Sequence, residues 1–211
     1  MRVTSRWLGL AGVAFVIVAF LGLNSLGDTP SLDEATSSEI IKHWTEVANG
    51  DLASALLVLC IPLLVIFGAS VLIRYHGSKA FPFDLWSFLF GVGIAMAAVG
   101  FAWEASAAAA IADATSSGFS DMVVGLHLGS TRVHMVWTVG LSVALLGAAG
   151  MFIPRAGFER VLGWTALVLG VVGLLPEPIG LVGTVVSVLW ILVMSITIVA
   201  TTSRAGHAGG T

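Results

Sequence analysis

Residues 52–73 read LASALLVLCIPLLVIFGASVLI, an apolar run without a single charged side chain. A bilayer has a hydrocarbon core about 30 Å thick, which a helix of roughly 20 apolar residues can cross. Five other stretches have the same character and are separated by polar segments. We therefore predict an all-α, polytopic transmembrane helical bundle that forms one domain over residues 1–211. The six predicted spans are 7–26, 52–73, 85–103, 133–153, 161–175 and 179–201.

The overall composition excludes several classes of protein. Of the 211 residues, 57% are hydrophobic and only 10% are charged, whereas a soluble domain has about 25% charged residues. The net charge of −3 comes without any basic tract, so the electrostatics do not favour a nucleic-acid partner. Cys60 is the only cysteine, which excludes an intrachain disulfide and a metal site built from cysteines. No cofactor is expected.

Charge placement predicts the orientation of the bundle. If there are six spans, seven basic residues fall on one side of the membrane: Arg2, Arg6, Arg74, Lys79, Arg155, Arg160 and Arg204. The opposite segments are rich in Asp and Glu, and apart from Arg132 at the start of the fourth span their only basic residue is Lys42. The positive-inside rule then places both termini in the cytoplasm. Trp103 and Trp137 are expected near the outer interface, in an aromatic belt.

The first apolar run has two interpretations. Its basic residues followed by an apolar stretch also fit a signal peptide, and cleavage would leave five spans. We favour a retained anchor, because the stretch is long and residues 22–25 offer no convincing cleavage site.

An outer segment at residues 31–49 is predicted to be a short amphipathic helix. Ser31 and Glu34 have the spacing of a capping box, in which each side chain bonds a free backbone N–H at the helix start. The apolar residues that recur at helical spacing are Ile40, Trp44 and Val47. We expect this helix to lie on the membrane surface or to cap the bundle. A lid over an outer cavity is the alternative.

Small residues recur four positions apart within several spans. The pairs are Gly91 with Ala95, Gly93 with Ala97, Gly140 with Ala144, and Ala166 with Gly170. Small residues at this spacing let two helix backbones approach closely. Packing within the bundle explains them, and homodimerisation is the alternative.

Four ionisable residues gather near the predicted outer boundary of the membrane and are the candidate ligand-binding residues. Glu104 ends the third span, while Arg132 and His134 begin the fourth. His127 precedes His134 by seven residues, so a continuous helix would place both on one face. A structural ion pair between Glu104 and Arg132 is the favoured interpretation. The alternatives are an outward-facing cavity for a small polar or anionic ligand and a metal site formed by the two histidines with a carboxylate.

The other histidines are expected to be ordinary surface residues; they are His43, His76 and His207. The chain also lacks a phosphate-binding loop, a dinucleotide fingerprint, a nucleophile elbow and a zinc-protease motif. We therefore expect no enzymatic activity, no catalytic residues and no metal.

The chain resembles a broad group of small six-helix bacterial, mostly actinobacterial, integral membrane proteins known as a domain of unknown function. The resemblance covers the whole chain in outline. It rests on Ser31-Leu32-Asp33-Glu34 after the first span, and on Gly163-Trp164, Gly170 and Gly173-Leu174-Leu175-Pro176 before the helix that contains Trp190. It implies a fold and a location in the bacterial plasma membrane, and it supplies no catalytic residues.

Two functions follow as expectations. The first is a non-catalytic structural or accessory component of the cell membrane, in contact with the lipid bilayer and with a membrane-protein partner or further copies of itself. The alternative is a small-solute binding or transport protein with an outward-facing polar site near Glu104, Arg132 and His134.

Overall fold

The computed structural model describes residues 4–27, 30, 35–75, 84–176 and 179–207. The regular secondary structure of these residues is helical throughout, without strands, which confirms the all-α part of the predicted fold class. Seven helices follow one another: α1 (Thr4–Asn24), α2 (Ser37–Glu46), α3 (Gly50–Tyr75), α4 (Leu85–Ser116), α5 (Ser120–Phe152), α6 (Phe158–Val172) and α7 (Ile179–His207).

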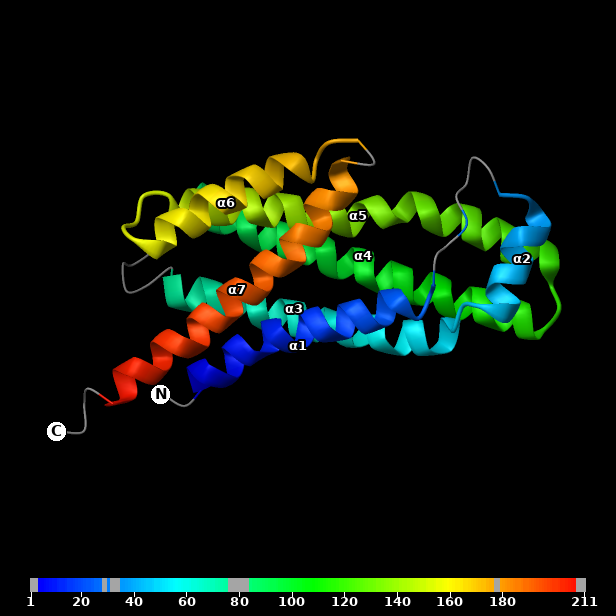
Figure 1. Ribbon diagram of the computed structural model, residues 1–211, viewed down its shortest axis with the longest axis horizontal. Coiled ribbons are helices and arrows are strands. Elements are labelled where there is room, and N and C mark those ends of the chain that lie inside the picture. The colour runs from blue at the N-terminus through cyan, green and yellow to red at the C-terminus, as the bar shows by residue number, and fades with distance from the viewer. Residues whose placement is uncertain (1–3, 28–29, 31–34, 76–83, 177–178, 208–211) are drawn as a thin grey trace.

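The helices form an elongated bundle with two different ends (Figure 1). The α4–α5 hairpin runs along its length, α3 packs against α4, and α1 packs against α3. Helix α6 lies on α5, and α7 contacts α6, α5 and α1. Both termini lie at one end, which we call the terminal end, and α2 lies across the other, which we call the α2 end.

The predicted spans and the observed helices coincide in position, but α4 and α5 are longer than expected. Helix α4 continues from residue 103 to Ser116, and α5 starts at Ser120 instead of residue 133. The alanines at 107–110 favour continued helix, so nothing interrupts α4 until the turn at Gly118, whose φ is +75°. The hairpin therefore carries two extra helical ends toward α2.

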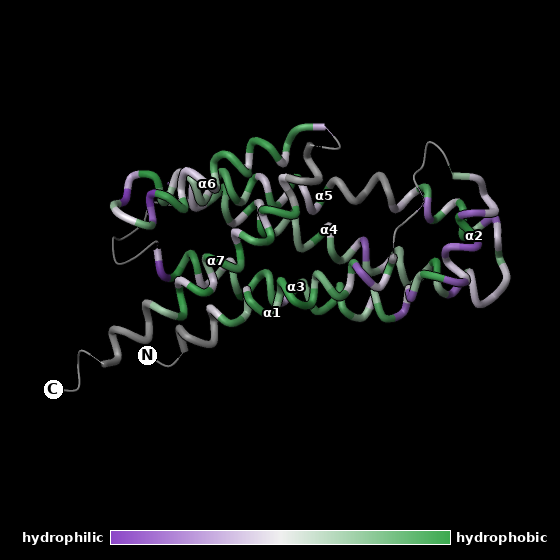
Figure 2. Tube along the Cα trace, viewed as in Figure 1, coloured by the Kyte–Doolittle hydropathy of each residue, from purple (hydrophilic) through white to green (hydrophobic). Residues whose placement is uncertain are grey.

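Two helices of the described chain, α3 and α4, are long and apolar enough to cross a membrane by length and composition. Shorter apolar stretches occur in α1 (Gly9–Asn24), α5 (Val136–Phe152) and α7 (Val185–Ala200). Figure 2 shows apolar residues along the bundle and hydrophilic residues gathered toward its two ends. A membrane association is consistent with this pattern, while the number of spans and their orientation stay predictions.

Glycines set the spacing and register of α4 against α5. A methyl group on Gly93 would overlap the backbone of Ala144, and one on Gly140 would overlap the backbone of Ala97. A Cβ on Gly100 would come within 2.5 Å of the Trp137 amide nitrogen. Small residues thus serve packing within the bundle at these positions, as predicted. The pair Gly91 with Ala95 does not, since a Cβ on Gly91 would meet nothing within 4 Å and Ala95 is exposed.

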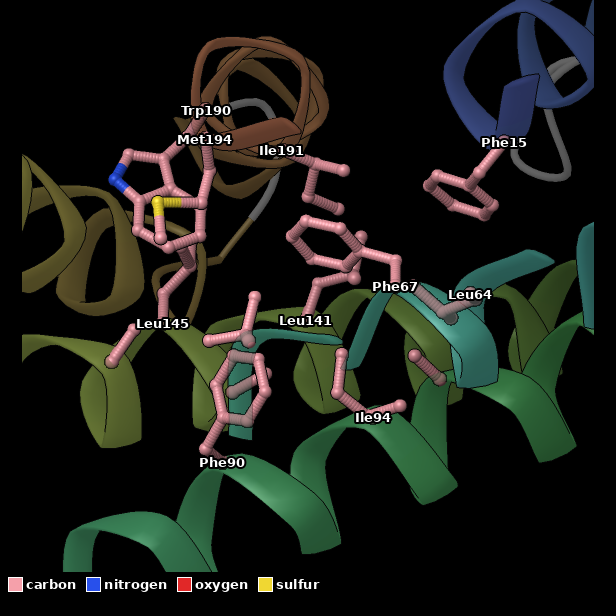
Figure 3. Packing of buried hydrophobic residues seen from close by; sticks show 14 of the residues in the cluster. Phe15, Leu64, Phe67, Phe90, Ile94, Leu141, Leu145, Trp190, Ile191 and Met194 are labelled. Carbon is pink, nitrogen blue, oxygen red and sulfur yellow. The ribbon is translucent and has the colours of Figure 1, made fainter. Parts of the chain in front are cut away.

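Aromatic side chains fill the middle of the bundle. Phe101 of α4 stacks on Trp137 of α5, with ring centroids 5.1 Å apart. Figure 3 shows Trp190 and Met194 of α7 over Leu145 of α5. The Trp190 indole N–H donates to the Leu162 carbonyl at 3.1 Å, so Trp190 packs between helices. This core fixes the helices that surround the candidate site.

The α2 end has its own small apolar cluster, in which Ile40 and Trp44 of α2 pack on the ends of α4 and α5. The predicted start of this helix is wrong, since α2 begins at Ser37 with a capping box formed by Thr36 and Glu39. Residues 31–34 lie outside the described residues. Val47 follows the helix and is exposed, so the apolar face of α2 is shorter than expected.

Candidate functional site

A cavity of about 690 Å³ lies between α1, α4, α5 and α7, with Trp44 of α2 at one end. Most of its lining side chains are apolar, and about half of the lining residues belong to α1 and α7. The lining side chains that carry a polar group are Trp44, Glu104, His127, Ser130 and Trp137. Ligand sites commonly have this character, with apolar walls and a few converging polar groups.

Two of the four predicted site residues, Glu104 and His127, line this cavity. The structure thus brings together one carboxyl group from α4 and one imidazole from α5. The register set by Gly93 with Ala144 and by Gly100 with Trp137 places Glu104 at the level of residue 133 in α5. The backbone of Arg132 and His134 is therefore level with Glu104, while their side chains lie outside the described residues. The predicted Glu104–Arg132 ion pair stays a prediction.

His127 joins three segments at the α2 end. The Trp44 indole N–H donates to His127 Nδ1 at 3.3 Å, and His127 Nε2 lies 3.4 Å from the Pro30 carbonyl oxygen. An Nδ1 atom that accepts a hydrogen bond carries no proton. The ring is therefore neutral, with its proton on Nε2 and donated to Pro30. This arrangement fastens α2 and the segment before it to α5.

Burial supports the neutral form of His127. The ring is 2% exposed, and loss of hydration lowers the pKa of this imidazole because the charged form loses most from leaving water. The Pro30 carbonyl acts in the opposite direction, and the nearby His43 lowers the pKa further. His127 lies before the predicted span at 133–153, in the extended end of α5.

His43 corrects one prediction from the sequence. It was expected on the surface, yet it is 6% exposed and its ring packs edge-on against Trp44, with centroids 5.8 Å apart. Its position explains this, because residues 40, 43 and 44 share one face of a helix. The sequence contained that signal in the spacing of His43 from Ile40.

Trp137 corrects another prediction. Trp103 is 57% exposed, as an aromatic belt requires, but Trp137 is only 3% exposed. Gly100 opposite it lets the backbone and Cβ of Trp137 lie close against α4, and the ring stacks on Phe101. Trp137 therefore lines the cavity instead of contacting the surroundings of the bundle.

No group of three or more His, Cys, Asp or Glu residues within the described part of the chain could hold a metal ion. The described residues therefore give no support to a metal site formed by His127 and His134 with a carboxylate. That site also requires the His134 side chain, which lies outside the described residues.

Comparison with family models, with curated proteins and with solved structures finds no match for this chain. The resemblance to small six-helix bacterial membrane proteins stays a prediction. Function must therefore be inferred from the cavity itself.

Proposed function

We propose that this protein is a six-span bundle of the bacterial plasma membrane that binds a small molecule in the cavity at its α2 end. The observation that carries the proposal is the cavity, in which Glu104 and His127 face a space enclosed largely by apolar side chains. Its volume of about 690 Å³ falls in the range of roughly 300–1,000 Å³ that is usual for ligand pockets.

The membrane location is supported by the surface of the bundle. Large apolar side chains are 50% or more exposed on several helices, among them Ile17, Phe20, Val58, Leu59, Ile73, Phe88, Val99, Val168, Val185 and Ile196. A water-soluble monomer rarely exposes apolar surface of such extent. Lipid contact removes the cost of that exposure.

The α2 end projects beyond the apolar part of the membrane in this proposal. Helix α4 has 32 residues, which makes it about 48 Å long, against a hydrocarbon core of about 30 Å. The positive-inside rule places the terminal end, with Arg155 and Arg160, in the cytoplasm. The cavity then faces the outer half of the bilayer and the space above it.

Each polar group has a proposed role. The Glu104 carboxylate accepts hydrogen bonds or pairs with a positive charge on the ligand, as acidic groups near membrane depth commonly do. His127 holds Trp44 over the α2 end of the cavity. Arg132 and His134, level with Glu104 in α5, are proposed to complete the polar end.

Ligand binding is preferred to a purely structural or accessory role. The α4–α5 interface uses Gly93 and Gly140 within the bundle, so these residues do not form a vacant surface for a partner. The accessory role stays an untested expectation.

The test is the identification of small molecules that co-purify with the protein from native membranes in a mild detergent. Ala107 lines the cavity, whereas Ala109 on the same helix does not. We expect one compound in near-stoichiometric amount with the wild type and with Ala109→Phe, and about tenfold less with Ala107→Phe, which fills the cavity. No enriched compound, or equal amounts with both variants, contradicts the proposal.

A further inference from the structure

Helices α1 and α7 touch along only part of their length. At the terminal end they are in close contact, since a Cβ on Gly9 would lie 2.9 Å from a methyl group of Val199 and one on Gly12 would overlap the Ser195 side chain. Toward the other end, Figure 1 shows α1 continuing in the direction of α2 while α7 turns toward α6. The two helices therefore diverge.

The cavity lies where they diverge. Three of its lining residues are on the outer part of α1, namely Ile17, Phe20 and Leu21, and two are on α7, namely Val185 and Leu189. These five side chains are 49–65% exposed. A side chain that both lines a cavity and remains exposed marks the edge of an opening. The cavity therefore opens sideways between α1 and α7, through apolar side chains.

The α2 end of the cavity has a different character. Trp44 is 7% exposed and is hydrogen-bonded to His127, so this end is covered. Among the side chains described as lining the cavity, Glu104 has the only carboxyl group and His127 the only imidazole. The space is thus apolar at its side opening and polar deeper inside.

We propose that the cavity takes an amphiphile from the surrounding bilayer, whose single apolar chain passes between α1 and α7 and whose head donates hydrogen bonds to Glu104. This inference rests on the proposed function and adds to it the ligand class and the route of access. An apolar opening admits a hydrocarbon chain without desolvation of polar groups. A carboxyl oxygen accepts hydrogen bonds from a head that carries N–H or O–H donors, which an alkyl amine or alcohol has and an ionised fatty acid lacks.

Bromine atoms on a lipid chain quench the fluorescence of a tryptophan that they contact. The protein has three tryptophans whose surroundings differ in the way this test requires. Trp137 lines the cavity, Trp103 is exposed on the outside of α4, and Trp190 is buried among helices away from the cavity. Three variants each keep one of these residues and have phenylalanine in place of every other tryptophan. The full-length proteins are placed in phosphatidylcholine vesicles with a dibrominated octadecyl amine, alcohol or carboxylic acid.

We expect the amine and the alcohol to quench Trp137 with saturation, and the acid to need about a tenfold higher concentration for the same effect. Trp103 should be quenched in proportion to the probe in the membrane, and Trp190 should not be quenched. Glu104→Gln should remove the advantage of the amine over the acid. Quenching of Trp137 no stronger than that of Trp190 overturns the inference, as does a preference for the acid.

A larger side chain at the opening tests whether the ligand enters between α1 and α7. Val188 lines the cavity on α7 and is half-buried, whereas Val193 lies further along α7 outside the cavity. Val188→Phe should raise the half-saturating concentration for Trp137 about tenfold, and Val193→Phe should leave it unchanged. Equal half-saturating concentrations in both variants would contradict entry of the ligand between α1 and α7. If a compound co-purifies with the protein while Trp137 is not quenched, the binding function stands and the bilayer amphiphile is excluded.

Discussion

The hydrogen bond from Trp44 to His127 makes the cover of the cavity sensitive to protonation. His127 Nδ1 accepts this bond, so a proton on Nδ1 removes it. Burial lowers the pKa of His127 in the folded protein, whereas the unfolded chain has an ordinary value of about 6.5. The stabilisation that neutral His127 provides is therefore fully present above the pKa of the unfolded chain. It is lost as the pH drops from that value toward the pKa of the folded protein, because the unfolded state then binds more protons.

We expect the free energy of unfolding to fall by about 1 kcal/mol between about pH 7.5 and pH 5.5, the usual net worth of one hydrogen bond. Groups around His127 are the Trp44 and His43 rings, the Pro30 carbonyl and, across the cavity, Glu104. The measurement is a titration with a denaturing detergent, followed by circular dichroism at each pH. His127→Gln should reduce the pH dependence. An equal slope for wild type and variant would contradict this explanation.

The sequence identified Glu104 and His127 because ionisable groups beside long apolar stretches are rare and costly. It did not assign His43 and Trp137 correctly, because their burial depends on which helix packs opposite them. Gly100, distant in sequence, lets Trp137 lie close against α4. Such pairings need the register of α4 against α5, which hydropathy does not provide.

At the scale of single elements, two glycines on α4 allow a matched test of helix packing. A Cβ on Gly93 would overlap the backbone of Ala144, while a Cβ on Gly91 meets nothing within 4 Å. Backbone cannot move aside as a flexible side chain can. Gly93→Ala should therefore force α4 and α5 apart and lower the free energy of unfolding by about 3 kcal/mol.

Gly91→Ala is the control. In a helix interior, alanine is more favourable than glycine by about 0.5–1 kcal/mol, so this variant should be as stable as the wild type or slightly more stable. The same detergent titration measures both variants. Equal stability of the two would show that the close contact of α4 and α5 does not hold the hairpin together.

The elements themselves were largely predictable, since the apolar stretches coincide with α1, α3, α4, α5, α6 and α7. The residues at which these helices begin and end were less predictable. The sequence spacing of Ser31 and Glu34 fits a capping box as well as that of Thr36 and Glu39, yet only the second pair stands at the start of α2. Hydropathy likewise marked where α4 and α5 stop being apolar, although both remain helical beyond those points.

For the whole molecule, hydropathy leaves the rotation and tilt of each helix open. An outward-facing cavity near Glu104 was one alternative from the sequence, but its walls and its side opening could not be predicted, because they depend on where α1 and α7 diverge. Close contact at Gly9 and Gly12 fixes one end of that pair, and packing of Trp190 against α6 draws α7 away from α1 farther along.

The orientation of the whole bundle can be tested with single cysteines. Cys60 is fully buried, so it should not react with a membrane-impermeant maleimide. Ser38 and Ser117 are exposed at the α2 end, and Ala156 is exposed at the terminal end. In intact bacterial cells, Ser38→Cys and Ser117→Cys should be labelled, because the basic residues of the terminal end keep that end in the cytoplasm.

Ala156→Cys should be labelled only after the membrane is permeabilised, and the wild type under neither condition. Labelling of Ala156→Cys alone in intact cells would mean that the bundle has the opposite orientation and that the cavity opens toward the inner leaflet. Labelling at both ends in intact cells would mean that the chain does not cross the membrane as a six-span bundle. The expected pattern would place the opening between α1 and α7 in the outer leaflet, where an amphiphile must enter if the proposed route is correct.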